Sequence, residues 1–285
     1  MSALEFIFRA RRSLRTWVTD RGDIRAAPAS ATIYPWINKL MIEIMRSTPG
    51  LRVEYLWGSL HGANLARSLG IESVSLIEFG VAGGTGLVSL ERIGHEIERH
   101  LSVETHVYGF DTGAGLPRPH DVRDCPNLFA EGDYGIDADK LRARLTSTRL
   151  ILGPVAETLE TFISSTPPPC AFVSFDLDLY TSTRDALLLF SGNTEMLLPR
   201  VHCYFDDVTG FTYGDFNGAR LAVAEFNERN DNRKVSRLYA MSHYVPARCA
   251  NDLWPKKLFM AHILDHPLYG EPDGLVRIAE RPLAS

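Results

Sequence analysis

Segments of strand length alternate with segments of helical spacing along most of the chain. The strand-length segments, most of them apolar, lie at residues 74–79, 105–110, 150–152, 171–175, 201–205, 234–239 and 258–264. Between them, apolar residues recur every three to four positions, as at Leu87, Leu90, Ile93 and Ile97. Runs that are apolar on both faces are typical of buried parallel strands. Strands that alternate with helices predict an α/β fold with a doubly wound, mainly parallel, seven-stranded Rossmann-like sheet.

Most of the residues before the first strand have a helical pattern. We predict helices over residues 1–25, 35–45 and 58–70, with a linker at residues 26–31. The chain therefore divides into a helical N-terminal extension, residues 1–70, and a Rossmann-like domain, residues 71–285. The first helix is basic and amphipathic. Such a helix can contact a membrane surface, but packing on its own domain or on a second copy in a homo-oligomer is favoured.

Further helices are expected inside the predicted domain. They cover residues 138–145, the segment up to Ile163, residues 184–190 with Ser182 or Thr183 as the N-cap, and residues 218–230. Residues 118–138 have no regular pattern. A long irregular segment at a strand end is more often a lid or a substrate wall than a linker.

Composition narrows the class of protein. The chain has 285 residues, of which 45% are hydrophobic and 23% charged, and a formal net charge of −5. A net negative charge argues against nucleic acid as the main partner. The sequence contains no run of 18 apolar residues, so we expect no membrane-spanning helix. The four scattered cysteines are typical of reduced thiols, and we therefore expect a cytoplasmic protein.

Two neighbouring strands are each followed by a pair of aspartates. Asp176 and Asp178 follow the fourth predicted strand, and Asp206 and Asp207 follow the fifth. Ligands of open α/β sheets bind beyond the carboxyl ends of the strands, so these side chains are expected at one site. Four carboxylates repel one another unless a cation lies among them, and a hard divalent cation with oxygen ligands is the simplest candidate.

The first strand runs into a glycine-rich turn. Its pattern, Glu78-x-Gly80-x-x-Gly83-Gly84-x-Gly86, departs from the GxGxxG spacing of dinucleotide sites. A carboxylate at Glu78 suits an ammonium group, and Asp111, at the end of the second strand, suits two ribose hydroxyls. An ammonium group at one end and a ribose at the other describe S-adenosylmethionine better than NAD.

The chain resembles the macrocin O-methyltransferase family over about residues 74–230. The motifs that carry the likeness are Ile77-Glu-Phe-Gly-Val-Ala-Gly-Gly84, Gly109-Phe-Asp-Thr112 with Gly115-Leu-Pro117, Gly153 with Glu157-Thr-Leu159, Asp176-Leu-Asp-Leu-Tyr-Thr-Ser-Thr183, and Asp206-Asp207. Members of this family are class I, metal-dependent methyltransferases that act on sugar hydroxyls. The resemblance implies a transferase that uses S-adenosyl-L-methionine and Mg²⁺ to methylate a hydroxyl of a small molecule, such as a sugar or a glycosylated natural product.

The resemblance also implies roles for individual residues. Asp176, Asp206 and Asp207 would bind magnesium, and Asp178 would be the general base. The expected cofactor-binding residues are Glu78, Gly80, Ala82, Gly84, Thr85, Asp111, Thr112, Gly153 and Asp176.

Three other functions fit parts of the pattern. A metal-dependent phosphohydrolase also uses a D-x-D pair after a strand, but usually after the first strand. A D-x-D glycosyltransferase fits the glycine turn less well. A third alternative is a non-catalytic binding module with a methyltransferase fold. The presence of all the acidic residues at the strand ends argues against it.

Overall fold

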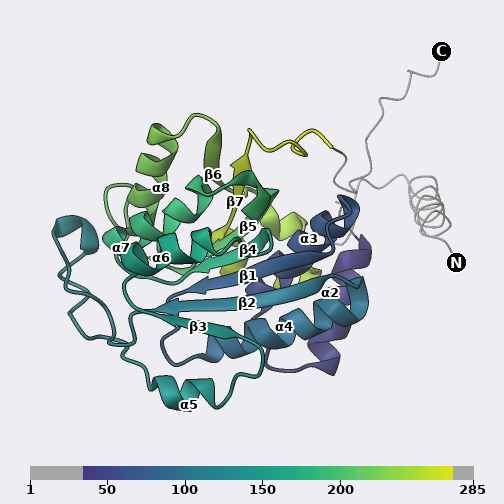
Figure 1. Cartoon of the computed structure of the whole chain (residues 1–285), viewed down its shortest axis with the longest axis horizontal. Coiled ribbons are helices and arrows are strands. Elements are labelled where there is room, and N and C mark those ends of the chain that lie inside the picture. Colours follow the sequence, from purple (N-terminus) through teal and green to yellow (C-terminus); the bar gives the residue numbers. More distant parts are fainter. Residues whose placement is uncertain (1–34, 211, 272–285) are drawn as a thin grey trace, which may run out of the picture.

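The computed structural model describes residues 35–210 and 212–271, and the helix and linker predicted within residues 1–31 lie outside them. A single seven-stranded sheet with the order β3-β2-β1-β4-β5-β7-β6 runs through the molecule (Figure 1). Its strands are β1 (Ser73–Phe79), β2 (Glu104–Asp111), β3 (Arg149–Leu152), β4 (Cys170–Phe175), β5 (Leu197–Phe205), β6 (Arg233–Arg237) and β7 (Leu258–Ile263).

Strand directions match the predicted fold class. β1 pairs in parallel with β2 and β4, β2 with β3, and β4 with β5. β7 is antiparallel to both β5 and β6. The prediction of a doubly wound, mainly parallel, Rossmann-like α/β fold is thus confirmed, with β7 as the antiparallel strand.

Helices cover both faces of the sheet (Figure 1). One face carries α2 (Pro35–Ser47), α3 (Val53–Ser68) and α4 (Thr85–Leu101), and the other carries α6 (Val155–Ser164), α7 (Tyr180–Ala186) and α8 (Gly218–Arg229). A short helix, α5 (Ala138–Arg142), lies beside β3 at the edge of the molecule. None of the helices in the described part of the chain combines the length and the apolar character needed to cross a membrane.

Some predicted element bounds were wrong. α3 begins at Val53, five residues before the predicted start, and β5 begins at Leu197 rather than at residue 201. The predicted helix at 184–190 instead begins at Tyr180, with Leu179 as its N-cap and no capping side chain, and continues as a 3-10 turn. Ser182 and Thr183, the two predicted N-caps, both lie inside α7, and Thr183 donates its hydroxyl to the Leu179 carbonyl at 2.9 Å.

The helices before β1 share the core of the sheet. Tyr55 and Leu56 of α3 are fully buried in the same hydrophobic cluster as Ile77 of β1 and Tyr204 of β5. The helices predicted at residues 35–45 and 58–70 are present as α2 and α3, with the bounds Pro35–Ser47 and Val53–Ser68, and α3 packs on the sheet. A division of the chain at residue 70 stays a prediction.

A row of phenylalanines supports the carboxyl edge of the sheet. Phe79, Phe110, Phe175 and Phe205 occupy the ends of β1, β2, β4 and β5 and are buried. Their ring centroids lie 4.7 Å apart from β1 to β2, 5.5 Å from β1 to β4, and 4.4 Å from β4 to β5. Close-packed aromatic rings resist displacement, so the residues that follow each strand start from a rigid base.

Candidate functional site

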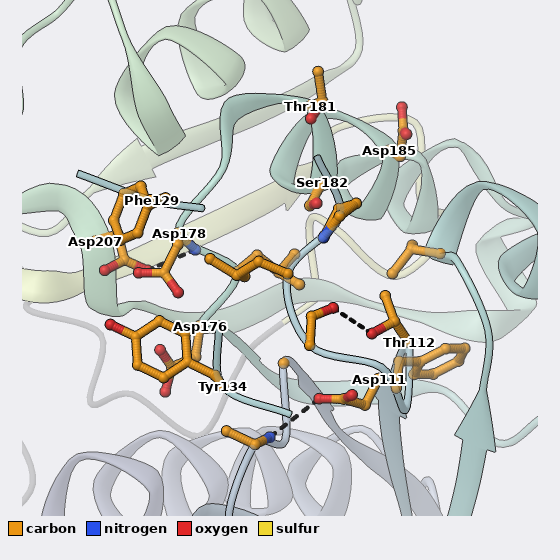
Figure 2. A pocket seen from close by; sticks show the side chains of 18 of the residues that line it. Asp111, Thr112, Phe129, Tyr134, Asp176, Asp178, Thr181, Ser182, Asp185 and Asp207 are labelled. Carbon is orange, nitrogen blue, oxygen red and sulfur yellow. Dashed lines mark hydrogen bonds between the residues drawn. The ribbon is translucent and has the colours of Figure 1, made fainter. Parts of the chain in front are cut away.

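A cavity of about 610 Å³ lies at this carboxyl edge (Figure 2). Strands β1 to β5 each contribute residues at or just after their carboxyl ends to the cavity wall. These are Gly80 and Ala82 for β1; Asp111, Thr112 and residues 115–117 for β2; residues 154–156 for β3; residues 176–178 for β4; and Asp206 and Asp207 for β5. The cavity thus occupies the position where open α/β sheets bind ligands.

Three aspartates meet on one side of the cavity. One carboxylate oxygen from each of Asp176, Asp206 and Asp207 lies within 4.8 Å of the other two. Parallel pairing of β4 with β5, in which Phe175 lies beside Phe205, brings these side chains together. Three oxygen ligands at such spacing are suited to a hard divalent cation.

Asp176, Asp206 and Asp207, which we call the acidic triad, differ in the direction of their pKa shifts. Burial and the neighbouring Asp207 and Asp206 raise the pKa of Asp176 to about 7. Burial and Asp178 likewise raise the pKa of Asp207. Burial also opposes ionisation of Asp206, but hydrogen bonds from Lys257 Nζ and Tyr204 Oη, both at 2.8 Å, outweigh it and lower the pKa. A bound cation would relieve the repulsion that disfavours the charged forms of Asp176 and Asp207.

Asp178 has an unusual backbone conformation. Its φ is +58°, in the left-handed region that non-glycine residues rarely adopt. This conformation turns its amide toward Asp207, whose Oδ2 accepts a hydrogen bond from it at 3.0 Å. Burial and the negative charge of Asp176 raise the pKa of the Asp178 carboxyl. A carboxylate with a raised pKa, facing the cavity, is suited to accept a proton.

The glycine turn brings the ends of β1 and β4 very close together. Gly80 has a φ of +83°, and a Cβ atom at this position would lie 1.7 Å from the carbonyl oxygen of Asp176. Asp111 holds the turn from the other side, because its Oδ2 accepts hydrogen bonds from the amides of Val81 and Ala82 at 2.9 and 3.1 Å. Its Oδ1 accepts one hydrogen bond, from Gly113 N at 2.8 Å, which leaves that oxygen free to accept another.

Glu78 faces the helices rather than the cavity. It is 1% exposed, its Oε1 accepts a hydrogen bond from Tyr55 Oη at 2.7 Å, and Gly86 of α4 packs against its carboxyl. Its Oε2 is buried and has no hydrogen-bond partner. Burial raises the pKa of Glu78 to about 8, so the group is mostly neutral at pH 7. An interaction with a ligand ammonium group stays a prediction.

The predicted site residues divide into two groups. Those that line the cavity are Gly80, Ala82, Asp111, Thr112, Asp176, Asp178, Asp206 and Asp207. Glu78, Gly84, Thr85 and Gly153 do not line it. Gly84 packs on Leu141 of α5, and Gly153 donates its amide to the Asp111 carbonyl at 2.9 Å, so both shape the neighbouring turns.

Several residues of the site were missed from the sequence. Phe129 and Tyr134, from the irregular segment after β2, line the cavity near the acidic residues (Figure 2). Tyr213, after β5, also lines it. Their position after strand ends was the available signal. Arg52 and Lys257 approach the triad from outside the lining, with Arg52 Nη1 3.6 Å from Asp176 Oδ2. These contacts join residues far apart in the chain, which no local pattern reveals.

Fold and site together define a Rossmann-like α/β protein with an acidic ligand cavity at the carboxyl edge of its sheet. No protein-family model matches the chain, and no curated protein matches it. Among solved structures, it is similar to CalS11, described as a calicheamicin methyltransferase, with 20% identity over 73% of this chain and 91% of that one and a TM-score of 0.47.

Two other similar structures are of proteins described as O-methyltransferases. NovP shares 17% identity over 62% of this chain and 72% of its own, with a TM-score of 0.47. TomG from Streptomyces achromogenes, solved with SAM, shares 12% identity over 88% of this chain and 96% of its own, with a TM-score of 0.38. At these values we draw nothing about activity from the likeness, and argue function from the cavity itself.

Proposed function

We propose that this protein is an O-methyltransferase that uses S-adenosylmethionine and a divalent metal, such as Mg²⁺, to methylate a hydroxyl of a small molecule. The observation that carries the proposal is the shared cavity of the glycine turn, Asp111 and the acidic triad. The glycine turn and Asp111 would hold the cofactor in the same cavity as Asp178 and the three aspartates. Such an arrangement suits transfer to an oxygen nucleophile.

The triad fits the implied metal by the chemistry of its donors. Asp176, Asp206 and Asp207 would hold the ion through carboxylate oxygens, the ligands that Mg²⁺ prefers. When bound, the metal would supply Lewis acidity that lowers the pKa of an acceptor hydroxyl. Lys257 contacts Asp206 and Arg52 lies 3.6 Å from Asp176, so among the described residues Asp207 is the member of the three with the least compensated charge.

Other residues of the chain would position the cofactor and move the proton. Gly80 lines the cavity at the turn, and Asp111 Oδ1 has capacity for one ribose hydroxyl. When bound, S-adenosylmethionine would supply the methyl group from its sulfonium. Asp178 would accept the proton of the acceptor hydroxyl, and burial makes it a stronger base than an exposed aspartate.

Calorimetry with S-adenosylmethionine and S-adenosylhomocysteine tests the cofactor. The full chain is expected to bind both in the micromolar range, with and without Mg²⁺, because the turn is separate from the triad. Asp111→Asn should weaken binding of S-adenosylhomocysteine by about tenfold, since an amide can accept hydrogen bonds at only one of its two terminal atoms.

The matched control is Asp139→Asn, at a 97% exposed side chain on α5, which should leave cofactor affinity unchanged. Circular dichroism would establish that both variants fold. If the wild-type chain bound neither S-adenosylmethionine nor S-adenosylhomocysteine, the methyltransferase proposal would be abandoned. A phosphohydrolase or a glycosyltransferase would then be tested with phosphate esters and nucleotide sugars.

A further inference from the structure

Asp124 is a buried carboxylate that lies outside both the acidic triad and the cavity lining. It ends a 3-10 turn, Val122–Asp124, in the segment between β2 and α5, and it is fully buried. Its Oδ2 accepts a hydrogen bond from the His120 amide at 2.7 Å. Its Oδ1 accepts hydrogen bonds from the Thr181 amide at 2.8 Å and from the Thr181 hydroxyl at 3.1 Å. Burying a carboxylate is unfavourable unless hydrogen bonds replace those of water, so these bonds define a specific contact.

The contact supplies an acceptor that the first turn of α7 needs. The first amides of a helix have no partner within the helix, and a polar N-cap side chain usually accepts a hydrogen bond from one of them. The N-cap of α7 is Leu179, whose side chain has no acceptor, and Thr181 carries the second amide of the helix. Asp124, 57 residues earlier in the chain, accepts from this amide instead. The start of α7 therefore depends on a residue that follows β2.

The start of α7 is also part of the cavity. Asp178, with its left-handed backbone conformation, lies two residues before Tyr180, the first residue of α7. Thr181 and Ser182, in the first turn, line the cavity. Because Asp124 anchors the amide of Thr181, it restrains the turn that presents Asp178 to the cavity.

The segment after β2 supplies an aromatic part of the cavity wall. The amide of Phe129 donates to the carbonyl of Cys125, the residue next to Asp124, at 3.3 Å. Phe129 and Tyr134 line the cavity, and Figure 2 shows Phe129 beside Asp207. In the sheet, β1 lies between β2 and β4, so this segment spans the end of β1 to reach α7. Asp124 therefore joins the wall that follows β2 to the wall that follows β4.

Arg123 makes a second contact between the same two walls, at a more exposed place. Its guanidinium carbon lies 4.4 Å from the centroid of the Tyr180 ring, and Tyr180 donates its hydroxyl to Glu225 of α8 at 2.8 Å. The Arg123 side chain is 38% exposed, and cation–π contacts are weaker at exposed sites than at buried ones. Asp124, which is fully buried, is therefore the stronger attachment.

We propose that Asp124 is a positioning residue for the methyl transfer, because it holds the wall that carries Phe129 against α7 at the acidic end of the cavity. This inference rests on the proposed methyltransferase function. The hydrogen bonds of Asp124 to described residues go to His120 and Thr181, not to the triad or the glycine turn. Loss of its carboxylate should therefore displace the wall and leave the binding of metal and S-adenosylhomocysteine unchanged.

The distance between Phe129 and a metal at the triad tests the proposal. The full chain would carry 4-fluorophenylalanine in place of Phe129, and Mn²⁺ bound at the triad would broaden its fluorine NMR signal, because paramagnetic broadening falls steeply with distance. We expect Asp124→Ala to reduce this broadening severalfold with no change in Mn²⁺ affinity. Asp124→Asn keeps one acceptor oxygen and should retain more of the broadening than Asp124→Ala. If Asp124→Ala lowered the melting temperature but left the broadening unchanged, its role would be structural only and the proposal would be overturned.

The same label in place of Phe205 is the internal control. Phe205 directly precedes Asp206 at the end of β5, so its signal should be broadened equally in the wild type and in Asp124→Ala. Thr181→Val removes one donor to Asp124 and keeps the amide, and it serves as a second variant if Asp124→Ala does not fold. It should reduce the broadening of Phe129 by a smaller amount, and an unchanged signal would count against the proposal.

Hydrogen exchange without metal or cofactor gives a second readout. The Thr181 amide should exchange about tenfold or more faster in Asp124→Ala than in the wild type, because its acceptor is gone. Asp139→Ala, at an exposed position on α5, should leave this exchange unchanged. Equal exchange of the Thr181 amide in Asp124→Ala and the wild type would contradict the inference. Failure of the wild type to bind Mn²⁺ or S-adenosylhomocysteine would instead contradict the proposed function.

Discussion

At the scale of single residues, Glu78 shows how burial can dominate the ionisation of a carboxyl beside the cavity. Its carboxyl has one hydrogen bond, from Tyr55, and a pKa raised to about 8 by burial. The unfolded chain would ionise this group near its ordinary value of 4.5. Between these two values the folded state keeps a proton that the unfolded state has lost, so stability falls as the pH rises.

Glu78→Gln should therefore flatten the pH dependence of stability. Between pH 5 and pH 8, we expect the wild-type free energy of unfolding to fall by about 3 kcal/mol more than that of the variant, measured by urea denaturation. Glu228→Gln, at an exposed position on α8, is the control and should follow the wild-type curve. Parallel pH curves for wild type and Glu78→Gln would show that Glu78 is ionised in the folded protein.

At the scale of elements, the turn between β1 and α4 depends on the absence of one side chain. A Cβ at Gly80 would overlap the carbonyl oxygen of Asp176, a backbone atom that cannot rotate away, and the φ of +83° adds strain. Gly80→Ala should lower the free energy of unfolding by about 3 kcal/mol or more and displace the end of β4. Urea denaturation measures the first effect, and weaker Mn²⁺ binding at the triad reports the second.

The same turn contains a matched control. A Cβ at Gly83 would meet no atom within 4 Å, and its φ is not in the left-handed region. Gly83→Ala should therefore change the free energy of unfolding by less than about 1 kcal/mol and leave Mn²⁺ binding unchanged. If Gly80→Ala and Gly83→Ala were equally stable, the close approach of the ends of β1 and β4 would not require glycine at position 80.

Elements also show how far the sequence predicts this structure. The strands and the positions of Asp176, Asp178, Asp206 and Asp207 follow from local patterns, because apolar runs mark buried strands and the polar residues mark their ends. The same patterns do not give strand direction, so the antiparallel placement of β7 between β5 and β6 could not be predicted.

That placement determines part of the site. β7 pairs with β5 so that Leu258 lies opposite Tyr204, and this register puts Lys257 beside Asp206. Arg52 reaches Asp176 only because α3 packs against β4 and β5. The positions of Lys257 and Arg52 depend on tertiary contacts. The sequence therefore predicts the three aspartates of the triad but not the cations that compensate their charge.

At the scale of the whole molecule, the proposed metal site would couple cation binding to the stability of the fold. Its acids come from two central strands, and burial together with Asp178 raises the pKa of Asp207. A raised carboxyl pKa means that ionisation destabilises the folded state, so without metal the protein should lose stability as the pH rises through that pKa. A cation that binds the folded state would reverse this loss.

We therefore expect Asp207→Asn to be more stable than the wild type without metal and less stable than the wild type with metal. At pH 8 in EDTA, we expect the variant to melt above the wild type by a few degrees, about 1 kcal/mol, since one repelling charge is gone and an amide oxygen still accepts a hydrogen bond. Saturating Mg²⁺ should raise the wild-type melting temperature by about 5 °C and that of the variant much less. Differential scanning calorimetry measures both, with Asp139→Asn as the control that behaves as wild type. Equal Mg²⁺ shifts in wild type and Asp207→Asn would mean that Asp207 is not a metal ligand, whatever the activity of the protein.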